Sequence, residues 1–161
     1  MAAACQGLLI VAFVGAALTK LGNLDQFFRA LAGLPWLSLR VARPATRVVP
    51  ISELVIAALL AVLPRIGAVV SLAALTLFTT IIAMEVAAGR SFHCGCFGGM
   101  GARPVGPATI ARNAFLAGAA ITLLVLPYSI VLGALLSGLG LGLCLLLAEI
   151  AAETLRMVRE T

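Results

Sequence analysis

Two cysteines separated by a single glycine are the residues of this sequence best suited to chemistry. Cys94 and Cys96 flank Gly95 in a segment rich in glycine and proline, residues 89–107. A disulfide across one intervening residue closes a small, strained ring, and strain makes a disulfide easier to reduce. The glycines let the backbone turn tightly and leave both sulfur atoms accessible. The pattern therefore predicts a pair that cycles between dithiol and disulfide rather than a structural crosslink.

A soft-metal site is the main alternative for the same residues. His93, Cys94 and Cys96 supply one imidazole and two thiolates, which are ligands for zinc, copper(I) or mercury. However, His93 is the single histidine of the chain, and no second cluster completes a set of four ligands. Redox chemistry is therefore preferred, while metal binding or transport and two incidental loop cysteines stay open.

The composition indicates what kind of protein positions this pair. Of the 161 residues, 63% are apolar and 11% are charged, and the mean hydropathy is +1.19. A soluble domain usually has about 45–50% apolar and about 25% charged residues. These values argue against a soluble enzyme and a disordered protein, and against a nucleic-acid partner despite a pI near 9.7. The length suits a single membrane domain over residues 1–161.

Apolar runs between the charges predict five membrane-spanning helices, because a helix needs about 20 apolar residues to cross the hydrocarbon core. We expect them near residues 3–21, 49–64, 66–88, 108–126 and 129–149. The last two come from one uncharged stretch that is too long for a single crossing, and Pro127 supplies the break. The expected fold is an all-α integral membrane bundle of about five transmembrane helices, a four-helix core plus one, with a polar tail at 150–161.

Two shorter features complete the expected architecture. Residues 26–31 could form a helix lying in the membrane interface, with Trp36 as an anchor. Ala134, Gly138 and Gly142 fall four residues apart on the last span, which is typical of a face for close helix packing.

Alternation of the spans puts one set of polar residues on the side of the cysteine pair. This set is Lys20, Glu53, Glu85, Arg90, Arg112 and Asn113. An ionisable group within a span is costly unless it has a partner. Glu53 is therefore expected to pair with Lys20 or with Arg112.

Each member of the expected site has a role. Cys94 or Cys96 attacks or accepts a disulfide, and the other cysteine resolves it. Arg90, with Lys20 or Arg112, stabilises the thiolate, because nearby positive charge lowers the pKa of a thiol. Glu53 positions a cation or moves a proton.

The other two cysteines are expected to stay outside this chemistry. Cys5 belongs to the opposite side of the membrane by the alternation of spans. Cys144 is expected toward the side of the pair, but a free cysteine in a span is more typical of a small buried apolar residue.

Several motifs occur in a fixed order along residues 3–126. They are Lys20 after the first apolar span, Pro50-Ile51-Ser52-Glu53 at the second, Gly89-Arg90 before Cys94-Gly95-Cys96-Phe97-Gly98, and Arg112-Asn113 at the fourth. In this order the motifs resemble the MauE-like, DoxX-related family of redox-associated membrane proteins. The last span and the tail match none of the family's motifs.

The resemblance implies thiol–disulfide chemistry at a bacterial inner (plasma) membrane. The protein that names the family is implicated in maturation of methylamine dehydrogenase, a disulfide-rich periplasmic enzyme, alongside a thioredoxin-like partner. The implied function is thus a thiol–disulfide oxidoreductase or relay protein that exchanges with a thioredoxin-like protein or a disulfide-bearing substrate. No cofactor is required, although a quinone is an alternative electron partner, and a non-catalytic docking subunit is the alternative function.

The orientation of the cysteine segment gives conflicting expectations. Ten of the eleven Lys and Arg residues lie on its side of the membrane, and only Arg65 lies on the other. The positive-inside rule therefore predicts a cytoplasmic segment. The family's role in an oxidising compartment implies an extracytoplasmic one, and we adopt the latter as the expectation.

Overall fold

A computed structural model describes residues 2–89 and 107–126, together with positions 136, 138–144 and 147. Its elements are α1 (Ala2–Gly22), α2 (Leu24–Ala32), α3 (Leu39–Val62), α4 (Pro64–Ala87) and α5 (Pro107–Val125). No strand occurs among these residues, so the predicted all-α fold is confirmed. Four of the helices, α1, α3, α4 and α5, are long and apolar enough to cross a membrane.

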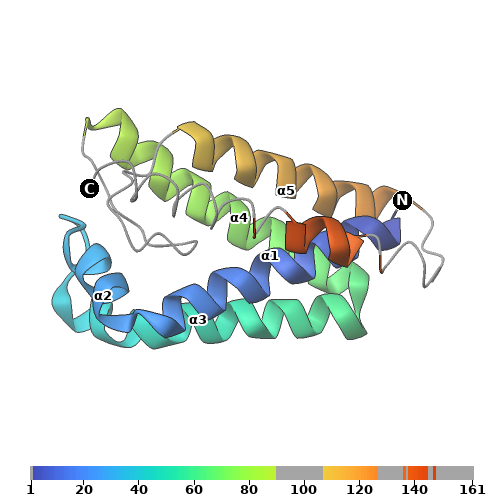
Figure 1. The fold of residues 1–161 in the computed structure, drawn as a ribbon. Helices are drawn as coiled ribbons and strands as arrows, with labels where there is room; N and C mark the ends of the chain where they lie inside the picture. Colours follow the sequence, from blue (N-terminus) through green and yellow to red (C-terminus); the bar gives the residue numbers. More distant parts are fainter. Residues whose placement is uncertain (1, 90–106, 127–135, 137, 145–146, 148–161) are drawn as a thin grey trace, which may run out of the picture.

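The four long helices form a closed bundle (Figure 1). α1 packs against α3 and α5, and α4 packs against the same two helices. The core between them includes the fully buried side chains of Leu9, Leu60 and Leu123. Large apolar side chains such as Val62 and Val125 are instead exposed on the outside. This arrangement suits lipid, because a helix satisfies its backbone hydrogen bonds internally and can present apolar side chains to the bilayer.

The second span begins earlier than the charge pattern suggested. α3 begins at Leu39, about ten residues before the expected boundary at 49, and it contains Pro44 and Pro50. Its first part carries exposed arginines at positions 40, 43 and 47, a spacing that keeps them on one helical face. The gap between charges therefore marks where the apolar surface begins, and the helix itself starts outside that surface.

A short helix and a helix end lie where the sequence predicted them. The expected interfacial helix at 26–31 is α2, whose single buried residue is Phe27. α5 ends at Val125, as expected for a chain that meets a proline at position 127. Residues 127–135 lie outside the described part of the chain.

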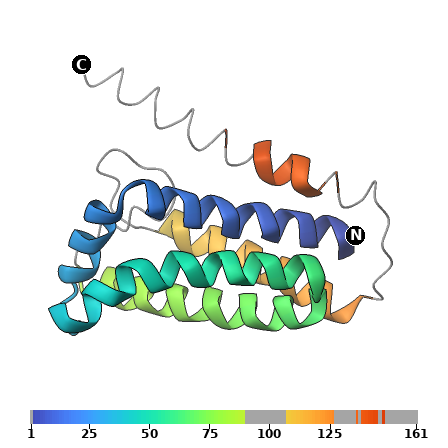
Figure 2. The same cartoon turned by 90° about the horizontal axis from the view of Figure 1, so that it is seen from below.

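The predicted small-residue face packs against α1. A Cβ atom on Gly138 would clash with the backbone of Ala4, and one on Gly142 would lie 2.8 Å from the Val11 side chain. Figure 2 shows this helical stretch alongside α1. Ala134, the third residue of the predicted face, is outside the described residues.

The turn between α3 and α4 brings Gly67 close to the backbone of α3. A Cβ atom there would lie 2.5 Å from the backbone nitrogen of Leu60. We expect Gly67→Ala to lower the free energy of unfolding by about 1–3 kcal/mol, because the two backbones must separate. Gly118→Ala is the matched control, because nothing lies within 4 Å of that position. Thermal unfolding in detergent, followed by circular dichroism, measures both; equal midpoints for the two variants would contradict the close contact.

Candidate functional site

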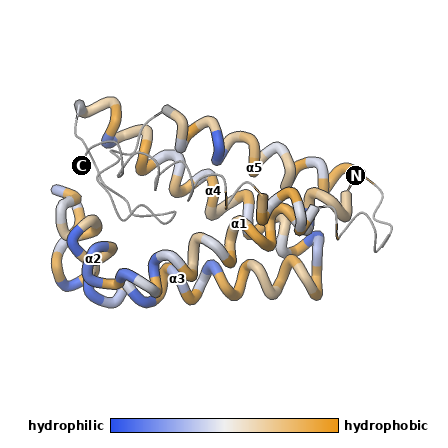
Figure 3. Tube along the Cα trace, in the orientation of Figure 1, coloured by the Kyte–Doolittle hydropathy of each residue, from blue (hydrophilic) through white to orange (hydrophobic). Residues whose placement is uncertain are grey.

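One end of the bundle gathers the polar side chains, and we call it the polar end. It comprises the end of α1, all of α2, the start of α3, the end of α4 and the start of α5 (Figure 1). Figure 3 shows hydrophilic positions gathering on α2 and the first part of α3. The opposite end holds the N-terminus of α1 and the α3–α4 turn. The polar end is therefore the part of the described bundle in which a site made of ionisable groups is expected.

A buried ion pair lies at the centre of the polar end. Lys20 Nζ lies 2.5 Å from Glu53 Oε1, and each side chain is only 3% exposed. Of the two partners expected for Glu53, the structure thus selects Lys20. The pair joins α1 to α3 across the bundle. Two charges at this depth are tolerated only because each offsets the desolvation cost of the other.

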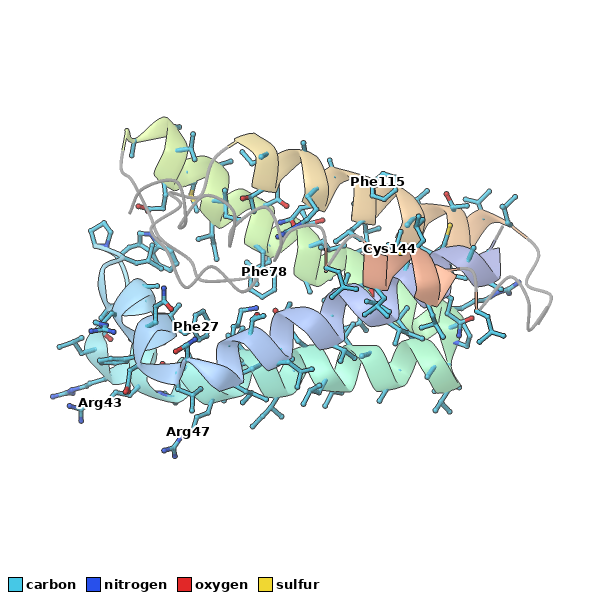
Figure 4. The ribbon with its side chains drawn as sticks, viewed as in Figure 1. Phe27, Arg43, Arg47, Phe78, Phe115 and Cys144 are labelled. Atoms are coloured by element: carbon cyan, nitrogen blue, oxygen red, sulfur yellow. The ribbon has the colours of Figure 1, made fainter. Side chains whose placement is uncertain are left out.

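Further contacts hold the ammonium group of Lys20 in place. Lys20 Nζ lies 3.4 Å from the carbonyl oxygen of Ala16, one turn earlier on α1. It also lies over the rings of Phe27 and Phe78, at 5.7 and 5.9 Å from their centroids. Figure 4 shows these two rings, from α2 and α4, near the space between the helices. Lys20 is therefore held by a carboxylate, a carbonyl and two aromatic faces.

A cavity of about 370 Å³ opens beside this ion pair. Its polar lining residues are Lys20, Glu53, Thr109, Arg112 and Asn113, contributed by α1, α3 and α5. The remaining lining residues are apolar or aromatic and include residues of α2 and α4. The charged groups among the described lining residues are the Lys20–Glu53 pair and the guanidinium of Arg112.

Two side-chain hydrogen bonds fix the surroundings of the cavity. Asn113 Nδ2 donates to Thr79 Oγ1 at 3.2 Å and ties α5 to α4. Trp36 Nε1 donates to Glu85 Oε1 at 3.1 Å. The second bond holds the residues between α2 and α3 against the end of α4. It also gives the buried Glu85 carboxylate a hydrogen-bond donor.

The cysteine-bearing segment leaves and re-enters the bundle at the polar end. Gly89 follows α4 with a φ of 67°, a left-handed conformation that favours glycine after a helix. Pro107 begins α5 at the same end. The predicted site residues Arg90, Cys94 and Cys96, and the alternative metal ligand His93, all fall within 90–106 and lie outside the described residues.

Four of the predicted site residues line one cavity: Lys20, Glu53, Arg112 and Asn113. The sequence did not single out the aromatic residues around it, because Phe27 and Phe78 cannot be told from core residues by spacing. Trp36 was expected only as an interface anchor, and its bond to Glu85 joins residues 49 positions apart. The signal that could have indicated this contact is Glu85 itself, because an acidic residue within an apolar span needs a hydrogen-bond donor or a cation.

The remaining cysteines lie away from the polar end. Cys5 is half-buried near the start of α1, at the opposite end of the bundle. Cys144 is exposed and follows Gly142, which packs on Val11 near the middle of α1 (Figure 4). It was expected toward the side of the cysteine pair, but its helix packs at the level of the bundle's middle. Within the part of the chain that the structure describes, no three His, Cys, Asp or Glu residues group as metal ligands.

Comparison with known proteins gives a consistent result. A family model described as "Methylamine utilisation protein MauE" matches residues 1–126. The chain is also similar to the "Methylamine utilization protein MauE" of Paracoccus denitrificans, with 33% identity over 118 residues. That alignment covers 71% of this chain and 63% of the relative, so less than two thirds of the relative is represented. No solved structure matches the chain.

Proposed function

Because the chain belongs to the MauE family and is a multi-pass membrane protein, we propose that it works in a membrane thiol–disulfide relay. Cys94 and Cys96 exchange electrons with a thioredoxin-like protein or with a disulfide-bearing substrate. The name of its relatives refers to methylamine utilisation, so a disulfide-bearing protein of such a system is the first substrate to test.

The attachment of the cysteine segment is the observation that carries this proposal. Cys94 is five residues beyond Gly89, and an extended chain spans at most about 3.6 Å per residue. Cys94 therefore stays within about 18 Å of the end of α4, and Cys96, two residues further on, stays within about 25 Å. The bundle is about 36 Å long, judged from the 24 residues of α4. Both ends of the cysteine segment, Gly89 and Pro107, attach at the polar end, which favours action of the pair there, beside the charged residues.

The charge of the cavity lining also supports the proposal. Glu53 already offsets the charge of Lys20, so that cation is better suited to a structural role than to direct contact with a thiolate. Arg112 also lines the cavity, and Arg90 lies four residues before Cys94 in the sequence. We assign the stabilisation of a thiolate to these two arginines.

The proposed exchange balances without a further reactant. One cysteine thiolate attacks the disulfide of the partner, which forms a mixed disulfide and releases one partner sulfur as a thiolate. The second cysteine then attacks the mixed disulfide, closes the Cys94–Cys96 disulfide and releases the other partner sulfur. Two electrons and two protons pass to the partner, and the reverse direction uses the same steps.

Thiol trapping in intact cells tests this function. A Cys5→Ser/Cys144→Ser variant, which retains only the pair, is treated with a membrane-impermeant maleimide before and after addition of a reductant. We expect labelling of Cys94 and Cys96 only after reduction, because the pair is held as a disulfide in an oxidising compartment.

The same experiment reports the sidedness of the pair. Labelling in intact cells means an extracytoplasmic segment, whereas labelling only after permeabilisation means the cytoplasmic side that the positive charges favour. Two cysteines that react fully before and after reduction, on either side, would contradict a redox-active pair.

A further inference from the structure

The cavity at the polar end concentrates aromatic side chains. Four aromatic residues of the described part of the chain line it: Phe13, Phe27, Trp36 and Phe78. Aromatic faces and edges favour a flat ring over a flexible acyl chain. The cavity is also accessible, since the lining residues Trp36 and Leu77 are 50% and 60% exposed. The walls therefore suit a flat, lipid-soluble ring.

The ion pair leaves one carboxylate oxygen without a hydrogen-bond donor on Glu53, a residue that lines this cavity. Glu53 Oε1 accepts from Lys20, whereas Glu53 Oε2 is buried and accepts no hydrogen bond from any described residue. A buried carboxylate oxygen without a donor costs free energy. A ligand with a hydroxyl group would supply that donor. The lining presents two cationic side chains, Lys20 and Arg112, and like charges repel, so the site favours a neutral ligand over an amine.

We propose that this cavity binds the ring of a membrane quinone. A quinone ring is flat, neutral and soluble in the bilayer, and its reduced form carries hydroxyl groups of which one can donate to Glu53 Oε2. The binding site follows from the cavity alone. Its use as an electron acceptor rests on the proposed function: two thiols lose two electrons and two protons to form a disulfide, and the quinone takes both to become a hydroquinone.

The single tryptophan of the chain gives a direct binding signal, because Trp36 lines the cavity. Purified protein in lipid nanodiscs is titrated with a short-chain ubiquinone and, separately, with a short-chain menaquinone, and tryptophan fluorescence is followed. We expect saturable quenching by at least one of them. The relative affinities of the two probes identify which ring the cavity prefers.

Matched phenylalanine variants test the site. Phe78→Leu is expected to raise the quinone concentration for half-maximal quenching by about three- to tenfold, the range of an aromatic contact. Phe115→Leu is the control, because Phe115 is exposed on α5 and lies outside the cavity lining (Figure 4). Phe27→Leu, on the short helix α2, is a second test in case Phe78→Leu fails to fold. A Cys94→Ser/Cys96→Ser variant should bind the quinone as the unchanged protein does.

Three results would overturn the quinone site. They are quenching that rises linearly without saturation, equal effects of Phe78→Leu and Phe115→Leu, and displacement of the quinone by an equal concentration of a long-chain fatty acid. Saturable binding in a protein whose cysteines never form a disulfide would instead refute the proposed relay and leave the quinone site standing.

Discussion

Replacing Lys20 by methionine is expected to lower the free energy of unfolding by about 3–5 kcal/mol, the cost of breaking a buried ion pair by removing one partner. The substitution leaves the Glu53 carboxylate, 3% exposed, without its cation and inside an apolar bundle. It also removes the contacts of the ammonium group with two aromatic rings. Unfolding in detergent micelles with increasing denaturant measures the change. Glu53→Gln should destabilise by a similar amount, because it leaves the Lys20 charge unpaired.

A double variant separates the ion pair from simple packing. Lys20→Met combined with Glu53→Leu removes both charges, so it should recover most of the stability that either single change loses. Arg47→Gln is the control for removing a charge at an exposed position of α3 (Figure 4), and a change within about 0.5 kcal/mol is expected there. Strictly additive losses in the double variant would contradict an energetic coupling between Lys20 and Glu53.

The helices could be predicted from the sequence because lipid imposes simple rules on length and polarity. Four long helices appear where the apolar runs predicted them, and α5 ends just before Pro127. The start of α3 was missed by about ten residues, because helix formation continues through Arg40, Arg43 and Arg47 into the aqueous or headgroup layer. Charge marks the membrane boundary, but a helix can extend beyond it as long as its own backbone bonds are made.

The candidate site was predictable only for its charged and polar members, Lys20, Glu53, Arg112 and Asn113. Glu53 needs a partner wherever it is buried, and alternating spans bring Lys20 and Arg112 to a similar depth, so a cationic partner followed from cost and topology. Only the structure selects Lys20 of the two. Which aromatic residues line the cavity depends on how each helix is rotated about its own axis. The sequence does not show this rotation, because the membrane helices are apolar on all sides. The bond from Trp36 to Glu85 depends on how the residues after α2 fold back, and no local pattern specifies that.

Replacing either cysteine of the pair by serine is expected to abolish disulfide exchange, a loss of activity larger than that of any other substitution proposed for this chain. Exchange needs one sulfur to attack and a second to release the mixed disulfide. The variant that keeps the attacking cysteine should therefore accumulate a mixed disulfide with its thioredoxin-like partner, whereas the other variant should form none. Non-reducing gel electrophoresis after acid quenching of membranes identifies which of Cys94 and Cys96 attacks.

The remaining cysteines supply internal controls with the same chemical change. Cys5 begins α1, fifteen residues before Lys20, which corresponds to about 22 Å along the helix. Cys144 follows the contact between Gly142 and Val11, which is also well before Lys20 on α1. Neither sulfur lies at the polar end, so we expect Cys5→Ser and Cys144→Ser both to keep full exchange. Full activity in Cys96→Ser would rule out a two-cysteine mechanism. Loss of activity in Cys5→Ser without loss of stability would mean that a thiol at the opposite end of the bundle takes part in the exchange. That result would contradict a mechanism confined to Cys94 and Cys96, whose segment is attached to the bundle at Gly89 and Pro107.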